Sequence, residues 1–187
     1  MVDTLINIDH SLFLLGNQVG ANAYLDLVFE QISNKYFWIP AYVFVAVVLY
    51  LQDKKYRFPI LGILVLGAAV GAADFISVHG FKNVFMRLRP CHEPVLEGLV
   101  ATLRGKCGGQ YGFVSSHAAN SFAIVGFLLK SERFKAHWKW ILLWGVLVAY
   151  SRVFLGVHYP GDVICGAVLG LFLGTFFHYL FRNYLRR

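Results

Sequence analysis

Five apolar stretches take up most of this chain and limit the folds that it can adopt. They cover residues 36–51, 58–81, 115–129, 140–155 and 160–181. The sequence is 58% hydrophobic and only 14% charged, whereas a soluble domain has about 45–50% apolar and about 25% charged residues. Apolar stretches of this kind are typical of helices that cross a bilayer. We therefore predict an all-α integral membrane protein in which five transmembrane helices form one bundle.

The segments before and after these stretches complete the predicted organisation. Residues 4–16 alternate polar and apolar side chains with helical spacing, which favours a helix lying at the membrane interface. Counting this helix as a span gives the alternative of six. We predict a single membrane domain over residues 1–187, with residues 1–34 as the interfacial helix and the segment after it. The transmembrane core then covers residues 36–181, and a basic tail covers 182–187.

The basic residues predict how the bundle is oriented. Loops 52–57 and 130–139 and the tail 182–187 are rich in lysine and arginine, and such loops stay in the cytoplasm. The long loop 82–114 and the turn 156–160 then lie together on the outer face. The net charge of +7 is spread over these loops instead of forming one patch, so we expect no nucleic-acid partner.

The turn between the last two apolar stretches carries the strongest chemical signal. Arg152, His158 and Asp162 fall within Ser151–Asp162, and charged groups at a membrane edge are costly enough to be functional by default. Pro160 breaks the chain, which puts His158 in a turn and Asp162 in the first turn of the next helix. The carboxylate can accept one ring N–H of His158 and leave the other nitrogen free to attack an electrophile.

Two further groups fall on the same predicted face. Lys82 and Arg89 are seven residues apart before a proline, so a helix that continued to that proline would point both side chains the same way. Ser115, Ser116 and His117 begin the third apolar stretch, where the N–H groups of a helix N-terminus favour an anion. With Arg152 these groups surround a space suited to a phosphate, which His117 could reach and where it could donate a proton to a leaving oxygen.

The spacing of the three groups resembles the motifs of the type 2 phosphatidic acid phosphatase superfamily. The pattern Lys-x6-Arg-Pro from Lys82 matches the family at every position, and so does Ser-Arg-x5-His-x3-Asp from Ser151. The middle motif departs from the family, because Val114-Ser-Ser-His117 stands where the family usually has Pro-Ser-Gly-His. The serine at position 116 still carries a backbone N–H, so we expect the anion site to survive.

The resemblance implies a reaction and a role for each residue. His158 would attack phosphorus to form a phosphohistidine, with Asp162 orienting it, and His117 would protonate the leaving group and then activate water. Lys82, Arg89, Arg152 and the Ser115–Ser116 segment would bind the phosphate oxygens, so no metal or cofactor is implied. The expected function is metal-independent hydrolysis of a lipid phosphate at the outer, periplasmic face of a bacterial inner membrane. Undecaprenyl pyrophosphate and lipid A phosphate lead the candidate substrates, ahead of phosphatidylglycerol phosphate and phosphatidic acid.

Several alternatives remain open from the sequence alone. The histidines in several apolar stretches would also suit a haem-binding membrane protein, and the cations would suit a binding or transport protein without chemistry. His158 and Asp162 could instead pair on a metal, which we regard as a minor interpretation. Cys91 and Cys107 lie in the long loop and form a plausible disulfide in an oxidising compartment, with two free thiols as the alternative. The sequence does not predict an oligomeric state.

Overall fold

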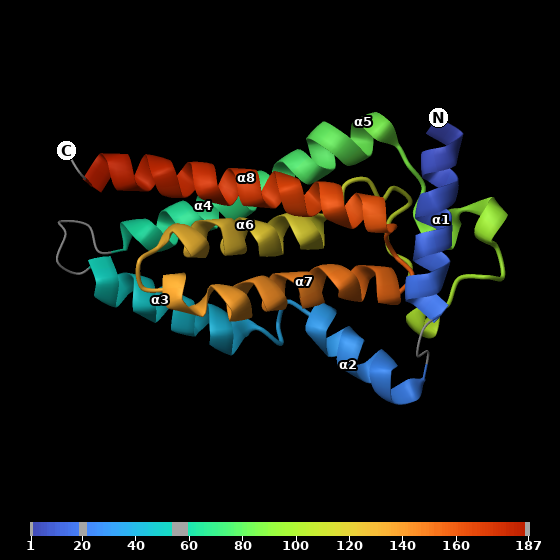
Figure 1. Cartoon of the computed structure of the whole chain (residues 1–187), viewed down its shortest axis with the longest axis horizontal. Coiled ribbons are helices and arrows are strands. Elements are labelled where there is room, and N and C mark those ends of the chain that lie inside the picture. The colour runs from blue at the N-terminus through green and yellow to red at the C-terminus, as the bar shows by residue number, and fades with distance from the viewer. Residues whose placement is uncertain (1, 19–21, 54–59, 186–187) are drawn as a thin grey trace.

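The chain folds as a bundle of helices, and no β-strand occurs among the residues that the structure describes (Figure 1). The structure is a computed structural model, which describes residues 2–18, 22–53 and 60–185. The helices are α1 (Val2–Gln18), α2 (Ala23–Ser33), α3 (Ile39–Asp53), α4 (Leu61–Phe75), α5 (Asn83–Phe85), α6 (Ser116–Lys130), α7 (Trp138–Phe154) and α8 (Pro160–Leu185). The predicted all-helical architecture is confirmed. Most of the predicted basic loop 52–57, the first residues of the second apolar stretch and residues 186–187 lie outside the described ranges.

Two stretches of helix are long and apolar enough to cross a membrane. One is Leu61–Phe85, in which α4 continues through a π-helical segment (Ile76–Lys82) into α5, and the other is Pro160–Tyr184. Only 22% and 28% of an 18-residue apolar segment within each stretch is buried inside the protein, so most of the residues in these segments lie on the outer surface. Ile39–Leu51 is apolar but shorter. Length and composition therefore identify two spans among the described residues, fewer than the five expected from the apolar pattern.

Helix α6 lies at the centre of the bundle and packs most closely against α8, with α4 and α7 on its other sides (Figure 1). Small residues line the α6–α8 contact and let the two backbones approach, as is common between membrane helices. They are Ala118, Ala119, Ala123 and Gly126 on α6, and Gly166, Gly170 and Gly174 on α8. The first turns of both helices are thereby held side by side at one end of the bundle.

The N-terminal helix α1 lies across that same end of the bundle (Figure 1). Asn17 fixes it there with hydrogen bonds from its side-chain amide to the carbonyls of Ala101, at 2.9 Å, and Phe154, at 2.8 Å. The segment after it, which the sequence analysis placed before the transmembrane core, forms α2. Helix α2 packs along α7 and begins with Asn22 as its N-cap.

The path after Lys82 differs from the expected one. The helix ends at Phe85, Met86 takes a left-handed conformation with φ of 47°, and the chain continues extended instead of remaining helical up to Pro90. Leu88 pairs with Tyr111 in an isolated bridge, and the N–H of Arg89 donates to the carbonyl of Gln110 at 3.1 Å. The prediction that Lys82 and Arg89 share a helix face is therefore wrong, because pairing with the end of the long loop outweighs continued helix.

Candidate active site

His158 and Asp162 form a buried pair in the turn between α7 and α8. Their side chains are 2% and 0% exposed, and Nδ1 of His158 lies 3.4 Å from Oδ2 of Asp162. The same oxygen accepts the N–H of Tyr159 at 3.1 Å, which fixes the carboxylate at the start of α8. Because an ionised carboxylate only accepts hydrogen bonds, this contact places a proton on Nδ1 and the lone pair on Nε2.

Arg89 faces the opposite nitrogen of His158. Its Nη1 atom lies 3.1 Å from Nε2 and 3.2 Å from the carbonyl of Val157, to which it donates. Burial lowers the pKa of His158 well below its usual value of 6.5, and the positive charges of Arg89, Arg152 and Lys82 lower it further. The imidazole is therefore neutral at neutral pH, which is the form that a nucleophile requires.

Lys82 is held at the first turn of α6. Its Nζ atom donates to Oγ of Ser116 at 2.7 Å, and the same hydroxyl lies 2.7 Å from Oγ of Ser77. The π-helical segment carries both Ser77 and Lys82 on the side facing α6. The sequence analysis placed Lys82 and Ser116 in one site, and the structure brings them into contact.

Ser115 serves as the N-cap of α6. It is fully buried, its Oγ accepts the N–H of Ala118, and its own N–H donates to the carbonyl of Asp162 at 3.0 Å. The side chain and the N–H of Ser115 are thus used to dock α6 against α8. The first N–H groups of a helix have no partner within the helix, so Ser116 and His117 present theirs at this end.

Arg152 approaches from the last turn of α7. Its Nη1 donates to Oγ of Ser33 on α2. Arg152 and Arg89 together line a cavity of about 370 Å³. The Nε atoms of Arg89 and Arg152 are both buried without a hydrogen-bond partner among the described residues. Buried N–H groups are seldom left unpaired, so both donors are available to an acceptor in this site.

His117 is half-buried in the first turn of α6. Arg152, His158, Lys82 and Arg89 are near enough to His117 to interact with it electrostatically. In the described part of the chain its ring makes no side-chain hydrogen bond, which leaves both nitrogens available to a ligand. The residues predicted for the site thus gather at one end of the bundle, although they come from four separate segments of the chain.

Two residues of this site were missed by the sequence analysis. Arg87 donates to Oδ1 of Asp162 at 2.9 Å, although the sequence analysis gave it no role. Gly112 lies so close to the His158–Asp162 pair that a Cβ there would be 2.9 Å from Oδ2 of Asp162 and 3.5 Å from Nδ1 of His158. The alternation Arg87-Leu88-Arg89 in an extended segment was the available signal for Arg87, whereas nothing local distinguished Gly112 from its glycine neighbours.

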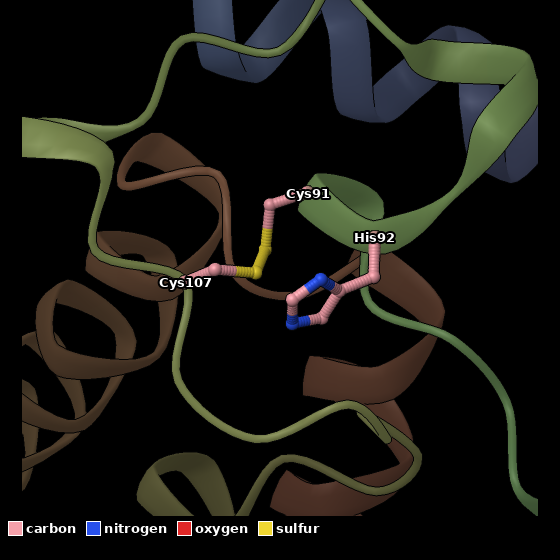
Figure 2. A group of neighbouring side chains, drawn as sticks. All are labelled: Cys91, His92 and Cys107. Atoms are coloured by element: carbon pink, nitrogen blue, oxygen red, sulfur yellow. A yellow bond between two sulfur atoms is a disulfide. The ribbon is translucent and has the colours of Figure 1, made fainter.

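The long loop is closed by a disulfide beside the site. Cys91 and Cys107 are bonded, with Cα atoms 5.9 Å apart, and His92 lies next to them (Figure 2). These three residues place potential ligand atoms within 4.8 Å of one another. Sulfur atoms in a disulfide are not the thiolates that bind a metal, so the group is better described as a structural closure of the loop that carries Arg89.

Comparison with known proteins supports a family assignment. The sequence profile of the PAP2 superfamily matches residues 62–186. The chain is 31% identical over 183 residues to a lipid A 4'-phosphatase of Bacteroides thetaiotaomicron, covering 96% of this chain and 80% of the relative. It is 34% identical over 187 residues to a lipid A 4'-phosphatase of Porphyromonas gingivalis, covering 98% and 76%.

A third relative carries a different activity in its name. An undecaprenyl-diphosphatase of Sulfolobus acidocaldarius is 31% identical over 157 residues, which covers 82% of this chain and 68% of the relative.

The fold resembles the crystal structure of a transmembrane PAP2 type phosphatidylglycerolphosphate phosphatase from Bacillus subtilis. The TM-score is 0.67 at 24% identity, with 98% of this chain and 89% of the other covered. The structure of Aquifex aeolicus LpxE gives a TM-score of 0.64, also at 24% identity, over 89% and 92%.

Proposed function

This chain belongs to the PAP2 superfamily and is a lipid phosphatase, and we propose that it removes a phosphate group from lipid A through a phosphohistidine intermediate. The observation that carries this proposal is the buried His158–Asp162 pair, with Nδ1 on the carboxylate and Nε2 turned towards Arg89. Two lipid A 4'-phosphatases align with nearly the whole chain, which supports lipid A as the first substrate to test.

The first chemical step is attack by Nε2 of His158 on phosphorus. The N–P bond forms while the ester P–O bond breaks, and the leaving oxygen takes a proton from His117. Asp162 keeps the Nδ1 proton in place and stabilises the positive imidazole of the intermediate. His117 then removes a proton from water, the water attacks phosphorus, and the N–P bond breaks to release inorganic phosphate and neutral His158.

Arg89, Arg152 and Lys82 supply the charge that balances the phosphoryl oxygens. The unpaired Nε atoms of Arg89 and Arg152 are the donors best placed for this role. The N–H groups at the start of α6, from Ser116 onwards, add the favourable end of a helix dipole. Ser115 contributes by holding that helix end against Asp162. Arg89 caps Nε2 of His158 in the structure, so an arriving phosphate would draw this guanidinium onto its own oxygens and free the lone pair.

The proposed location is the inner membrane of a bacterium, with the site facing the periplasm. Five spans would be formed by α3, the continuous helix from α4 to α5, and α6, α7 and α8, with α1 lying at the outer interface. Helices α6 and α7 have 15 and 17 residues, so their flanking turns would complete the crossing. The disulfide in the long loop supports an oxidising compartment on the side of the site.

A second candidate substrate is undecaprenyl pyrophosphate. It is favoured by the relative from Sulfolobus acidocaldarius, which covers 82% of this chain. The same groups would serve this reaction, since His158 would attack the terminal phosphorus and the leaving oxygen would belong to a phosphate instead of a sugar.

Phosphate release from purified lipids tests the proposal. We expect detergent-solubilised protein with EDTA to release phosphate from lipid A faster than from undecaprenyl pyrophosphate, phosphatidylglycerol phosphate or phosphatidic acid. His158→Ala removes the nucleophile and should lower turnover by about a thousandfold or more. His137→Ala is the matched control, since this exposed histidine precedes α7 in the 130–139 loop, and it should keep wild-type activity. A His158→Ala protein with wild-type turnover would refute the phosphohistidine, and preference for the pyrophosphate would select the second substrate.

A further inference from the structure

The N-terminal helix makes specific contacts with the turn that carries the nucleophile. Tyr159, which follows His158, is fully buried. The ring of His10 stacks on it with centroids 5.0 Å apart, and Phe13 meets it edge-on at 5.5 Å. Helix α1 lies across the ends of α7 and α8 in Figure 1, so its inner face covers the turn between them.

Asp9 on α1 binds this turn through both carboxylate oxygens. Oδ1 accepts the N–H of Gly161 at 2.8 Å, and Oδ2 accepts Nη2 of Arg87 at 2.7 Å. A Cβ at position 161 would lie 2.8 Å from Oδ2 of Asp9, so the carboxylate fits only beside a glycine. Asp9 therefore contacts the backbone between His158 and Asp162 and also the arginine that binds Asp162.

Arg87 is shared between two carboxylates. Its Nη2 atom donates to Asp9, and its Nη1 atom donates to Oδ1 of Asp162 at 2.9 Å. Its guanidinium also lies 4.1 Å above the ring centroid of Tyr159. This arrangement leaves Oδ2 of Asp162 to the N–H of Tyr159 and to Nδ1 of His158. Each end of the arginine fork is thus used by a different acid.

We propose that Asp9 is a positioning residue for the reaction, acting through Arg87 and Asp162 on His158. Arginine binds a single carboxylate most strongly with both ends of its fork. While Asp9 holds one end, Arg87 can take only Oδ1 of Asp162. Without Asp9 the fork is free to close on both oxygens of Asp162 and to compete with His158 for Oδ2. His158 then loses its carboxylate partner, and the backbone of Gly112 is the hydrogen-bond partner that remains on that side of the ring. This inference rests on the proposed phosphohistidine chemistry.

The role of Asp9 is separable from the docking of α1. Asn17, on the same helix, is 1% exposed. Its side chain donates to the carbonyls of Ala101 and Phe154 and accepts the N–H of Ala101 at 2.9 Å. With the ring contacts of His10 and Phe13, these bonds hold α1 in place when the charge of Asp9 is removed. Asp9→Asn keeps the size of the side chain, so it changes mainly the ion pair with Arg87.

The test is steady-state kinetics with p-nitrophenyl phosphate and with the preferred lipid. We expect Asp9→Asn to lower kcat about tenfold to a hundredfold, because a small misplacement of the attacking group has that effect, with little change in KM. In a double-mutant cycle Asp9→Asn should have almost no further effect on an Arg87→Gln protein. Asp26→Asn, in the first turn of α2, is the matched carboxylate control and should leave kcat unchanged. Asn17→Ala should lower the unfolding temperature more than it lowers kcat.

Each outcome bears on a distinct claim. An Asp9→Asn protein with wild-type kcat, an additive cycle, or a loss confined to KM would overturn the positioning role. If Asp9→Asn does not fold, Arg87→Lys serves in its place, since a lysine keeps the charge but cannot bridge two acids as a fork, and its kcat should fall similarly. Turnover of p-nitrophenyl phosphate without turnover of lipid A would refute only the proposed lipid. No turnover of any substrate by the wild-type protein would refute both proposals.

Discussion

At the residue scale, the site depends on how little space surrounds His158. The histidine is 1% exposed, with Asp162 at one ring nitrogen and Arg89 at the other. The backbone of Gly112 packs against His158 and Asp162. Its N–H donates to the carbonyl of Arg87 at 2.8 Å, and it has no side chain that would push His158 and Asp162 apart. The orientation of His158 is therefore set by backbone proximity as well as by hydrogen bonds.

This packing predicts that Gly112→Ala inactivates the enzyme. The new Cβ would lie 2.9 Å from Oδ2 of Asp162 and 3.3 Å from Cγ of Arg89, so the carboxylate must move away from His158. We expect kcat to fall about a hundredfold, as for other small displacements of reacting groups. Gly109→Ala is the matched control, because nothing lies within 4 Å of its Cβ position. Equal activities for the two variants would show that the close packing of Gly112 against Asp162 has no effect on the reaction.

At the element scale, the pairing of α6 with α8 places the two halves of the site. His117 lies in the first turn of α6 and Asp162 in the first turn of α8, so the register of these helices sets how the two histidines face each other. A Cβ at Gly166 would lie 2.5 Å from the carbonyl of Ser115, and one at Gly126 would lie 2.7 Å from the carbonyl of Leu171. Glycine on both helices permits this separation, because the opposing atoms are backbone and cannot rotate away.

Enlarging a residue at this contact should destabilise the protein. Gly170 faces the carbonyl of Ala119 and the N–H of Ala123, so Gly170→Ala must separate the helices. We expect it to cost about 1–3 kcal/mol, the usual range for overpacking, measured by unfolding in detergent. Gly71→Ala on α4, where a Cβ meets nothing within 4 Å, should be neutral or slightly stabilising, because alanine favours helix over glycine. A Gly170→Ala protein as stable as Gly71→Ala would contradict the close approach of α6 and α8.

At the scale of the whole molecule, the two ends of the bundle differ in chemistry. One end carries the site, α1 and the disulfide-closed loop. The opposite end carries the turn between α6 and α7, where Lys130, Arg133, Lys135 and Lys139 lie within ten residues. Clusters of this kind remain on the cytoplasmic side, so the whole chain is expected to have one orientation, with the site outside.

Cysteine labelling tests this orientation. A Cys165→Ala protein has no reactive thiol among the described residues, because Cys91 and Cys107 form the disulfide. The labelling of each newly introduced cysteine can therefore be measured by itself. We expect Glu97→Cys in the long loop to react with a membrane-impermeant maleimide on intact spheroplasts. Ala136→Cys in the turn before α7 should react only after permeabilisation. Both positions are exposed, so the reverse labelling pattern would mean that the site faces the cytoplasm.

The sequence alone was sufficient for features that depend on local patterns. The apolar stretches predicted the long helices to within a few residues: the third was expected over 115–129, and α6 covers Ser116–Lys130. His158 lies in a turn and Asp162 in the first helical turn, as Pro160 indicated. Such features follow from hydrophobic periodicity and from the geometry of proline, which act over a few residues. The motif spacing likewise indicated the family.

Only the tertiary structure decided which groups meet. Arg89 reaches His158 across 69 residues of sequence, and Asp9 reaches Gly161 across 152. The first contact requires the helix to stop at Phe85 and the chain to pair with Tyr111, and the second requires α1 to fold across the end of the bundle. Periodicity within a segment says nothing about either event, because both are set by the shape and charge of distant surfaces. The local sequence therefore determined the helices and the turn that carries His158, while long-range packing determined which groups orient that histidine.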